Sequence, residues 1–213
     1  SAVALVEISP TYLDGGGEVT APLPLEQVGH VEQVPAEPQP HWVWVSDQNF
    51  GSMPDGRAVL VDGDSGRVFG MLNTGYAFIA LTLPSSYHEI YSAETYYSRT
   101  TRGERTDVVS IYDPVDLTPK AEIVIPPKRA SSIPVMDSAT LTDDGRYMAV
   151  FNMTPGTSLS IVDVKTRQFV GEIPLTGCTM VWPAGTRRYF TMCSDGSMRL
   201  ITIDDDGKLT GTI

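Results

Sequence analysis

The feature that most constrains the fold is a repeated unit in which an apolar strand ends at an aspartate, a turn follows and a second strand begins. The four copies read RAVLVDGDSGRVFGML, DVVSIYDPVDLTPKAEIVIP, SLSIVDVKTRQFVGEIPL and SMRLITIDDDGKLTGTI. Their matching aspartates are Asp62, Asp113, Asp163 and Asp204, at intervals of 51, 50 and 41 residues. Such a period is typical of chains that stack similar units side by side.

A second recurring unit, an apolar strand, a turn and an aromatic strand, precedes the last three copies. It reads YAFIALTLPSSYHEIYSAET, SATLTDDGRYMAVFN and CTMVWPAGTRRYFTMCS. Four strands in each repeat predict an all-β fold, a β-propeller of four-stranded blades. The chain would hold three complete blades and a first one, starting at HWVWVSD, that lacks its first strand. Because a propeller ring has about four to eight blades, we expect a fragment of a longer chain or a ring completed by another polypeptide.

The first forty residues differ in composition from the rest. They are rich in proline and contain a triple glycine at 15–17. This composition predicts an extended arm over residues 1–40, followed by the propeller blades over residues 41–213.

Charge and hydropathy exclude two classes of partner. The formal net charge is −11, whereas binding to nucleic acid requires a broad basic surface. The sequence has no apolar run long enough for a membrane-spanning helix. We therefore expect neither a nucleic acid nor a membrane as a partner. The three histidines are scattered and no Cys/His cluster is present, so we predict no metal site.

The two cysteines, Cys178 and Cys193, flank the predicted turn PAGTRR at equal distances. A hairpin that turns there places them on opposite strands, at a Cα separation that a disulfide tolerates. A disulfide would indicate the periplasm or the cell exterior, and the alternative is two buried free thiols in a reducing compartment.

A dense cationic stretch, SRTTRGERTDVVSIYDP, contains Arg99, Arg102 and Arg105. Gly103 and the following β-branched residues predict a loop that leads into a strand. The arginines could dock a partner that carries carboxylates, because Arg binds carboxylates in a bidentate manner. Alternatively, Arg102 or Arg105 pairs with Asp107 or Glu104 and fixes the loop internally.

This stretch, together with PPKR, TSLSIVDV, VSDQNF, GRVFGM and the cysteine pair, resembles the large (heavy) subunit of the quinoprotein amine dehydrogenases. That family comprises methylamine and aromatic amine dehydrogenases, and the resemblance runs from about Val43 to Ile213. It implies a seven-bladed propeller, of which this chain holds about four blades. It also implies a periplasmic α2β2 heterotetramer with a small, disulfide-rich subunit that carries tryptophan tryptophylquinone.

The resemblance further implies the reaction, the oxidative deamination of a primary amine to an aldehyde and ammonia. The electrons pass to a blue copper protein of the amicyanin or azurin kind. Phe50, in SDQNFGSMPDG, falls where the family places a phenylalanine that lines the substrate channel, and the alternative is an ordinary loop aromatic. The arginine loop would then contact the small subunit.

No catalytic residue, metal or cofactor is expected in this chain itself. Its tryptophans, Trp42, Trp44 and Trp182, lie on expected strands, and two cysteines cannot supply the cross-linked scaffold of the small subunit. Two other functions remain open. One is a stand-alone propeller that acts as a binding or scaffold module, and the other is a propeller hydrolase such as a lactonase, which needs Asp, Glu, Asn and His side chains around a central metal.

Overall fold

The computed structural model describes residues 32–47, 51, 53–132 and 136–213. The chain divides into two compact units, residues 1–32 and 33–213, and all the named strands belong to the second. Phe50 lies outside the described residues.

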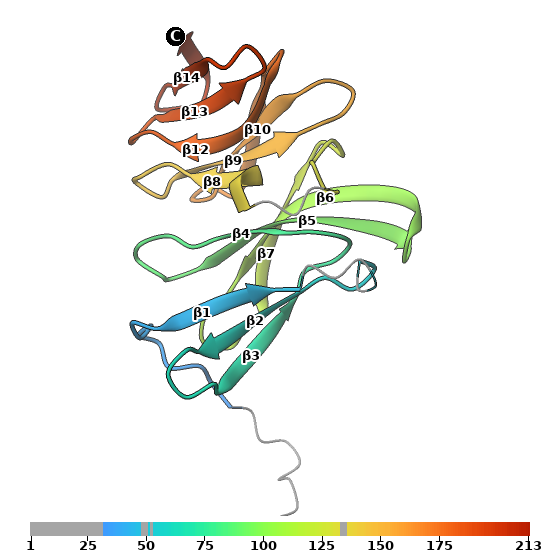
Figure 1. The fold of residues 1–213 in the computed structure, drawn as a ribbon, viewed down its shortest axis with the longest axis vertical. Helices are drawn as coiled ribbons and strands as arrows, with labels where there is room; N and C mark the ends of the chain where they lie inside the picture. Colours follow the sequence, from blue (N-terminus) through green and yellow to red (C-terminus); the bar gives the residue numbers. More distant parts are fainter. Residues whose placement is uncertain (1–31, 48–50, 52, 133–135) are drawn as a thin grey trace, which may run out of the picture. The chain divides into compact units, whose positions relative to one another are not determined.

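The second unit consists of antiparallel sheets whose strands follow one another in chain order (Figure 1). The first sheet has three strands, β1 (Trp42–Ser46), β2 (Arg57–Asp62) and β3 (Val68–Asn73). The second has four, β4 (Ala80–Thr82), β5 (Ile90–Arg99), β6 (Arg102–Tyr112) and β7 (Pro119–Ile125).

The short 3-10 helix η2 (Met136–Ser138) leads into the third sheet, formed by β8 (Ala139–Leu141), β9 (Tyr147–Asn152), β10 (Ser158–Asp163) and β11 (Gln168–Pro174). The fourth sheet contains β12 (Cys178–Pro183), β13 (Arg188–Cys193), β14 (Met198–Ile203) and β15 (Leu209–Thr212). Three four-stranded sheets and one three-stranded sheet are the blades that the repeat predicts.

The repeated aspartates have a common local role. Asp113 accepts hydrogen bonds from the backbone N–H groups of Val115 and Asp116, and Asp163 accepts them from Lys165 and Thr166. Side-chain oxygens that bind nearby backbone N–H groups stabilise tight turns. Each repeat therefore needs an aspartate where its third strand turns into its outermost strand, and this requirement explains the period.

Antiparallel order places alternate connections at opposite ends of a sheet. The turns that begin at Asp62, Asp113, Asp163 and Asp204 lie at one end, which we call the aspartate end. The β5–β6 and β9–β10 hairpins lie at the other end, where they project to the same side in Figure 1. We call this the ribbon end. Two isolated bridges, Gly75 with Thr95 and Arg129 with Asn152, join neighbouring sheets there.

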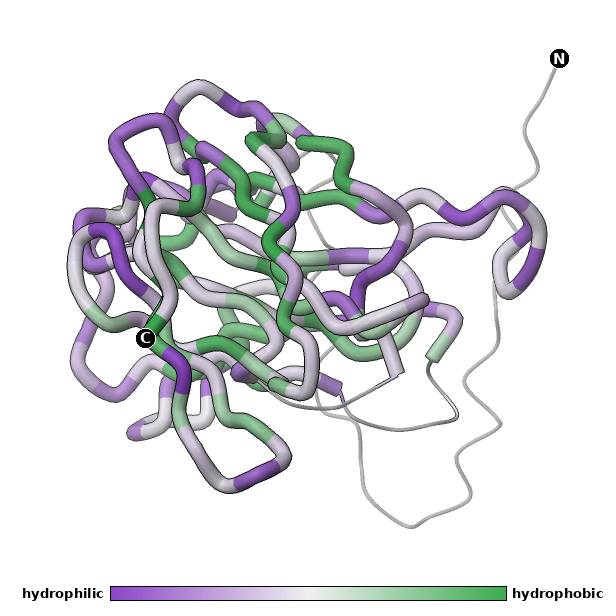
Figure 2. The backbone as a smooth tube through the Cα atoms, turned by 90° about the horizontal axis from the view of Figure 1, so that it is seen from above, coloured by the Kyte–Doolittle hydropathy of each residue, from purple (hydrophilic) through white to green (hydrophobic). Residues whose placement is uncertain are grey.

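The cores lie between successive sheets. Apolar side chains of β5 and β6, including Val109 and Ile111, pack against β8, β9 and β10. A second cluster, including Phe151 and Tyr189, fills the space between the third and fourth sheets. The cluster shared by the first two sheets has five buried members, and the buried polar side chains of Glu94 and Ser110 occupy part of that interface. In Figure 2 the hydrophobic segments accordingly lie within the body and many of the turns are hydrophilic.

Cys178 and Cys193 are direct cross-strand partners on β12 and β13, and they form the predicted disulfide. The alternative of two free thiols is excluded, since the structure contains no free cysteine. The disulfide packs at the edge of the core between the third and fourth sheets.

Residues 33 and 34 run beside the second sheet. Val34 is buried, and its backbone N–H donates to the carbonyl of Val115, while the amide of Gln33 donates to Asp116. The final residues of the predicted arm therefore contact the turn that follows β6.

Candidate functional site

The longest hairpin of the structure carries the cationic stretch. β4 pairs with β5 only as far as Ala93, and β7 pairs with β6 only as far as Asp107. Residues 96–106 therefore form a two-stranded ribbon with both edges free, which extends beyond the second sheet (Figure 1). A two-stranded ribbon is marginally stable in water unless it is anchored at its base.

The tip of the ribbon places two positive charges opposite each other. Arg99 and Arg102 are cross-strand partners and both are exposed. In the part of the chain that the structure describes, neither of them pairs with a carboxylate. Like charges directly opposite each other destabilise a strand pair, and at the tip these two face each other without a carboxylate partner in the described part of the chain.

Arg105 differs from the two tip arginines, because it is paired inside the protein. Its Nε and Nη2 atoms each donate to one carboxylate oxygen of Asp107 at 2.8 Å, and Nη2 also donates to the carbonyl of Arg129. This is the internal pairing that the sequence left open as an alternative. The cationic stretch is thus divided into a neutralised base and an open tip.

Asp107 is the centre of a buried network. It is fully buried and accepts four hydrogen bonds, two from Arg105, one from the hydroxyl of Thr95 and one from the backbone N–H of Arg129. These donors compensate for much of the cost of removing a carboxylate from water. The network fixes the base of the ribbon to the connection between β7 and η2.

Arg129 is a second buried charge in the same network. Its Nε donates to Thr95 Oγ1 at 3.1 Å and its Nη1 donates to the carbonyl of Phe78 at 2.9 Å. Burial lowers the pKa of Arg129 to about 10, although the neighbouring Asp107 and Glu94 favour its charged form. At that pKa the guanidinium remains protonated at neutral pH.

On the opposite face of the second sheet, a buried carboxylate lies among hydroxyl groups. Glu94 accepts hydrogen bonds from Ser110 at 2.5 Å, from Tyr96 at 2.7 Å and from Tyr112 at 2.8 Å. Burial raises the pKa of Glu94, and the hydroxyl donors oppose that rise. The carbonyl of Asn73 lies 3.0 Å from the Tyr112 hydroxyl, so this cluster also connects the first two sheets.

Neither Arg129 nor Glu94 was identified as a site residue from the sequence. A weak signal was present for both, because PPKR interrupts an apolar region and SAET places an acidic residue in a buried strand. Phe50 lies outside the described residues, and Met53, three positions later, accepts a hydrogen bond from the N–H of Ala77.

Each of the three tryptophans of this chain contacts a different aromatic side chain. Trp42 packs on Phe69, Trp44 donates from its indole N–H to the hydroxyl of Tyr87, and Trp182 stacks on Phe190.

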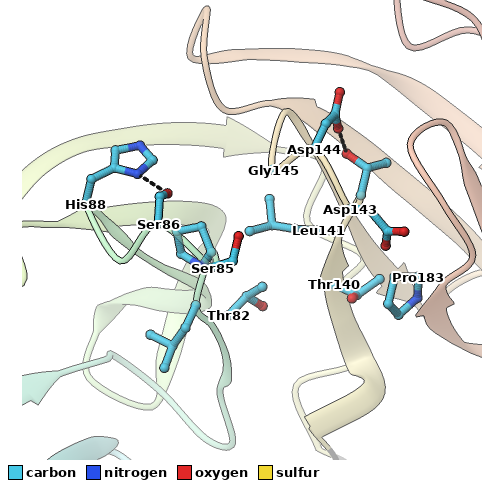
Figure 3. Close-up of a pocket in the computed structure, with 13 residues that line it drawn as sticks. Thr82, Ser85, Ser86, His88, Thr140, Leu141, Asp143, Asp144, Gly145 and Pro183 are labelled. Atoms are coloured by element: carbon cyan, nitrogen blue, oxygen red, sulfur yellow. Dashed lines mark hydrogen bonds between the residues drawn. The ribbon is translucent and has the colours of Figure 1, made fainter. Parts of the chain in front are cut away.

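A pocket of about 300 Å³ lies at the aspartate end, between the β4–β5 and β8–β9 connections (Figure 3). Ser86 and His88 are hydrogen bonded in it, and across the pocket Asp144 accepts a hydrogen bond from Thr142. A Ser-His-Asp hydrolase needs the carboxylate to orient the histidine. Here Asp144 is instead bound by Thr142 and Arg187, so the pocket does not have that arrangement.

Among the residues that the structure describes, no group of three or more His, Cys, Asp or Glu side chains could hold a metal ion. Within the same ranges, no helix is long and apolar enough to cross a membrane.

Comparison with known proteins gives a family and a fold. The family model described as methylamine dehydrogenase heavy chain (MADH) matches residues 41–212. The methylamine dehydrogenase heavy chain of Methylophilus methylotrophus is 28% identical over 208 residues, which are 98% of this chain and 50% of the relative. That of Methylobacillus flagellatus is 29% identical over 149 residues, 70% of this chain and 37% of the relative.

Among solved structures, the dihydro-heme d1 dehydrogenase NirN in complex with DHE matches with a TM-score of 0.57 at 20% identity, over 86% of this chain and 36% of that one. The Dos1 propeller matches with a TM-score of 0.57 at 15% identity, over 79% of this chain and 41% of that one. These likenesses concern the fold alone, and they confirm the predicted propeller. The chain spans half or less of the length of these curated relatives.

Proposed function

The chain belongs to the methylamine dehydrogenase heavy chain family, and from this premise we propose that it is the non-catalytic large subunit of a periplasmic amine dehydrogenase. The complex would oxidatively deaminate a primary amine to an aldehyde and ammonia, and would pass the electrons to a blue copper protein. The match over residues 41–212 is the observation that carries the proposal.

In this proposal the chemistry belongs to a small partner subunit that holds tryptophan tryptophylquinone. The separate packing of Trp42, Trp44 and Trp182 supports a cofactor outside this chain. The blades would form a scaffold for the small subunit in an α2β2 heterotetramer. The Cys178–Cys193 disulfide supports a periplasmic location, because disulfides persist in oxidising compartments.

Two features of this chain would face the partner. The tip arginines Arg99 and Arg102 would bind carboxylates of the small subunit, while Arg105 and Asp107 hold the base of the ribbon. Phe50 would line the amine channel, in keeping with its position in the sequence. The tip arginines lie on the β5–β6 connection at the ribbon end, opposite the aspartate turns.

Co-expression with a candidate small subunit tests the function. The two chains should co-purify, the complex should show quinone absorbance, and a dye should be reduced only when amine is added. The large subunit alone and the small subunit alone serve as controls. A chain that purifies alone and neither binds the small subunit nor supports amine-dependent dye reduction would instead be a stand-alone propeller module.

A further inference from the structure

The buried Arg129 links the base of the ribbon to the segment between the first two sheets. Arg129 precedes η2 in the chain, yet its side chain and its backbone N–H together contact three other parts of the structure. Nε contacts Thr95 on β5, Nη1 contacts the carbonyl of Phe78, and the backbone N–H contacts Asp107 on β6. The sequence separations of these contacts are 34, 51 and 22 residues, so none of them is a local turn contact.

The segment that Arg129 contacts, residues 74–79, leads from β3 to β4. Other hydrogen bonds of this segment reach β5 on one side and residues 53–56 on the other. Tyr76 N–H donates to the carbonyl of Thr95 at 2.7 Å, and Ala77 N–H donates to the carbonyl of Met53 at 2.6 Å. Gly56 N–H donates to the carbonyl of Gly75 at 2.7 Å, so residues 53–56 rest directly on this segment.

The close packing of this segment leaves little room for adjustment. A Cβ on Gly75 would lie 2.7 Å from the Thr95 carbonyl oxygen and 2.9 Å from the Tyr96 ring, and Gly75 has a φ of +73°. A side chain at Gly56 would lie 2.8 Å from the carbonyl oxygen of Gly75. Segment 74–79 is therefore held by backbone contacts on both sides, and the guanidinium of Arg129, from the connection after β7, donates to the carbonyl of Phe78 within it.

The charge of Arg129 is retained at a cost. Its side chain is fully buried, and Nη2 has no partner among the described residues. A buried guanidinium is expensive unless its partners compensate for the lost hydration. The negative charge of Asp107 favours the charged form of Arg129, and the Asp107 carboxylate accepts hydrogen bonds from the Arg129 backbone N–H and from Arg105.

We propose that Arg129 is a positioning residue: through the Phe78 carbonyl it fixes segment 74–79, and through that segment it fixes Met53 to Gly56 at the ribbon end. The positioning role depends on the proposed function only in its extension to the amine channel. That extension is made because Phe50, which would line the channel, precedes Met53 by three positions in the sequence. Arg129 would touch neither the amine nor the cofactor. It would affect amine preference by setting the backbone position of residues 53–56.

Amide hydrogen exchange of the isolated chain tests the positioning without any partner. In Arg129→Met, the amides of Tyr76, Ala77 and Gly56 should exchange about tenfold faster or more, because a hydrogen bond to a charged group contributes roughly 1.5 to 3 kcal/mol. Arg129→Lys retains the charge without the planar fork and should give a smaller increase. It also serves as the test variant if Arg129→Met does not fold.

Arg146→Met is the matched control. It removes a part-buried arginine that pairs with Asp163 at the aspartate end. It should accelerate exchange near Lys165 and Thr166 and leave Ala77 unchanged. Unchanged exchange at Ala77 in a folded Arg129 variant, or equal acceleration in the control, would overturn the proposal.

The link to amine preference has a separate readout in the assembled complex. The ratio of kcat/KM for a short aliphatic amine to that for an arylethylamine should change in Arg129→Met, should be partly restored in Arg129→Lys and should stay constant in Arg146→Met. Faster exchange at Ala77 with an unchanged ratio would overturn the link to the channel. Failure of the complex to oxidise any amine would contradict the proposed function, and the exchange result would still stand.

Discussion

The guanidinium of Arg105 lies alongside the carboxylate of Asp107, with Nε and Nη2 each 2.8 Å from one carboxylate oxygen. Because Asp107 is fully buried and Arg105 is mostly covered, the pair is largely shielded from solvent. The same carboxylate also binds the N–H of Arg129. One side chain therefore holds the ribbon base, the strand below it and the connection to the third sheet.

Asp107→Asn should destabilise the protein strongly. The variant removes the negative charge that most favours the charged form of the buried Arg129, and it removes one half of the Arg105 pair. Breaking a buried ion pair by removing one partner costs about 3 to 5 kcal/mol. The free energy of unfolding in urea measures the loss. Asp143→Asn, at an exposed position, is the control and should change stability little; equal stability of the two variants would contradict the network.

Glu94→Gln should alter how stability depends on pH. Burial raises the pKa of Glu94 in the folded state above its ordinary value of 4.5. The raised pKa contributes stability that is fully present below pH 4.5 and is lost as pH rises through the folded-state pKa. The variant has no charge to bury, so its stability relative to wild type should increase with pH across that range.

The Glu94→Gln variant places an NH2 group where one carboxylate oxygen was. The hydroxyl of Tyr112 accommodates this group, because it can donate to the carbonyl of Asn73 instead. Urea unfolding of both proteins at pH 4, 6 and 8 measures the difference. A difference in stability that does not vary with pH would mean that Glu94 does not titrate differently in the folded state.

The disulfide should stabilise the fourth sheet. It joins residues 15 positions apart, and a loop of that length contributes about 3 kcal/mol in the chain-entropy account. The Cys178→Ala, Cys193→Ala double variant should lose that amount, and reduced wild type should unfold at nearly the same urea concentration. Mass spectrometry after alkylation without reduction should find no modified cysteine in the denatured wild type.

Features with a local cause could be predicted from the sequence. The aspartate turns depend on hydrogen bonds to residues two or three positions away, so their four copies indicated the number of blades. The second recurring unit, which precedes only the last three copies, indicated the missing first strand. The pairing of Cys178 with Cys193 follows from the symmetry of a short hairpin. A periodic local pattern was therefore sufficient to recognise the propeller.

Features with distant partners could not be predicted in the same way. Arg129 binds groups 22 to 51 residues away, and nothing in its neighbourhood in the sequence indicates them. The role of Arg105 remained undecided between two interpretations until the position of Asp107 beneath it was known. The polar interface around Glu94 depends on how the first two sheets pack, which strand patterns alone do not give.

Removing the charges of the ribbon tip should weaken binding of the small subunit. The Arg99→Ser, Arg102→Ser double variant should bind about fivefold less tightly at low salt, since an exposed ion pair contributes roughly 0.2 to 1 kcal/mol. The effect should shrink as salt rises, because screening weakens exposed pairs. Titration calorimetry measures the affinity. The matched control, Lys165→Ser with Arg188→Ser at the aspartate end, should bind like wild type.

Phe50→Ala should change which amine the complex prefers more than it changes the maximal rate. An aromatic side chain on the entry path would discriminate by shape, and a hydrophobic pocket distinguishes substrates by about 1 to 3 kcal/mol per methylene. Because the residue would not touch the bond that breaks, kcat should change less than kcat/KM. The measurement is kcat/KM for a short aliphatic amine and for an arylethylamine in wild type and variant. If the ratio between the two amines stays the same, Phe50 does not line the channel, and the interpretation of an ordinary loop aromatic would stand.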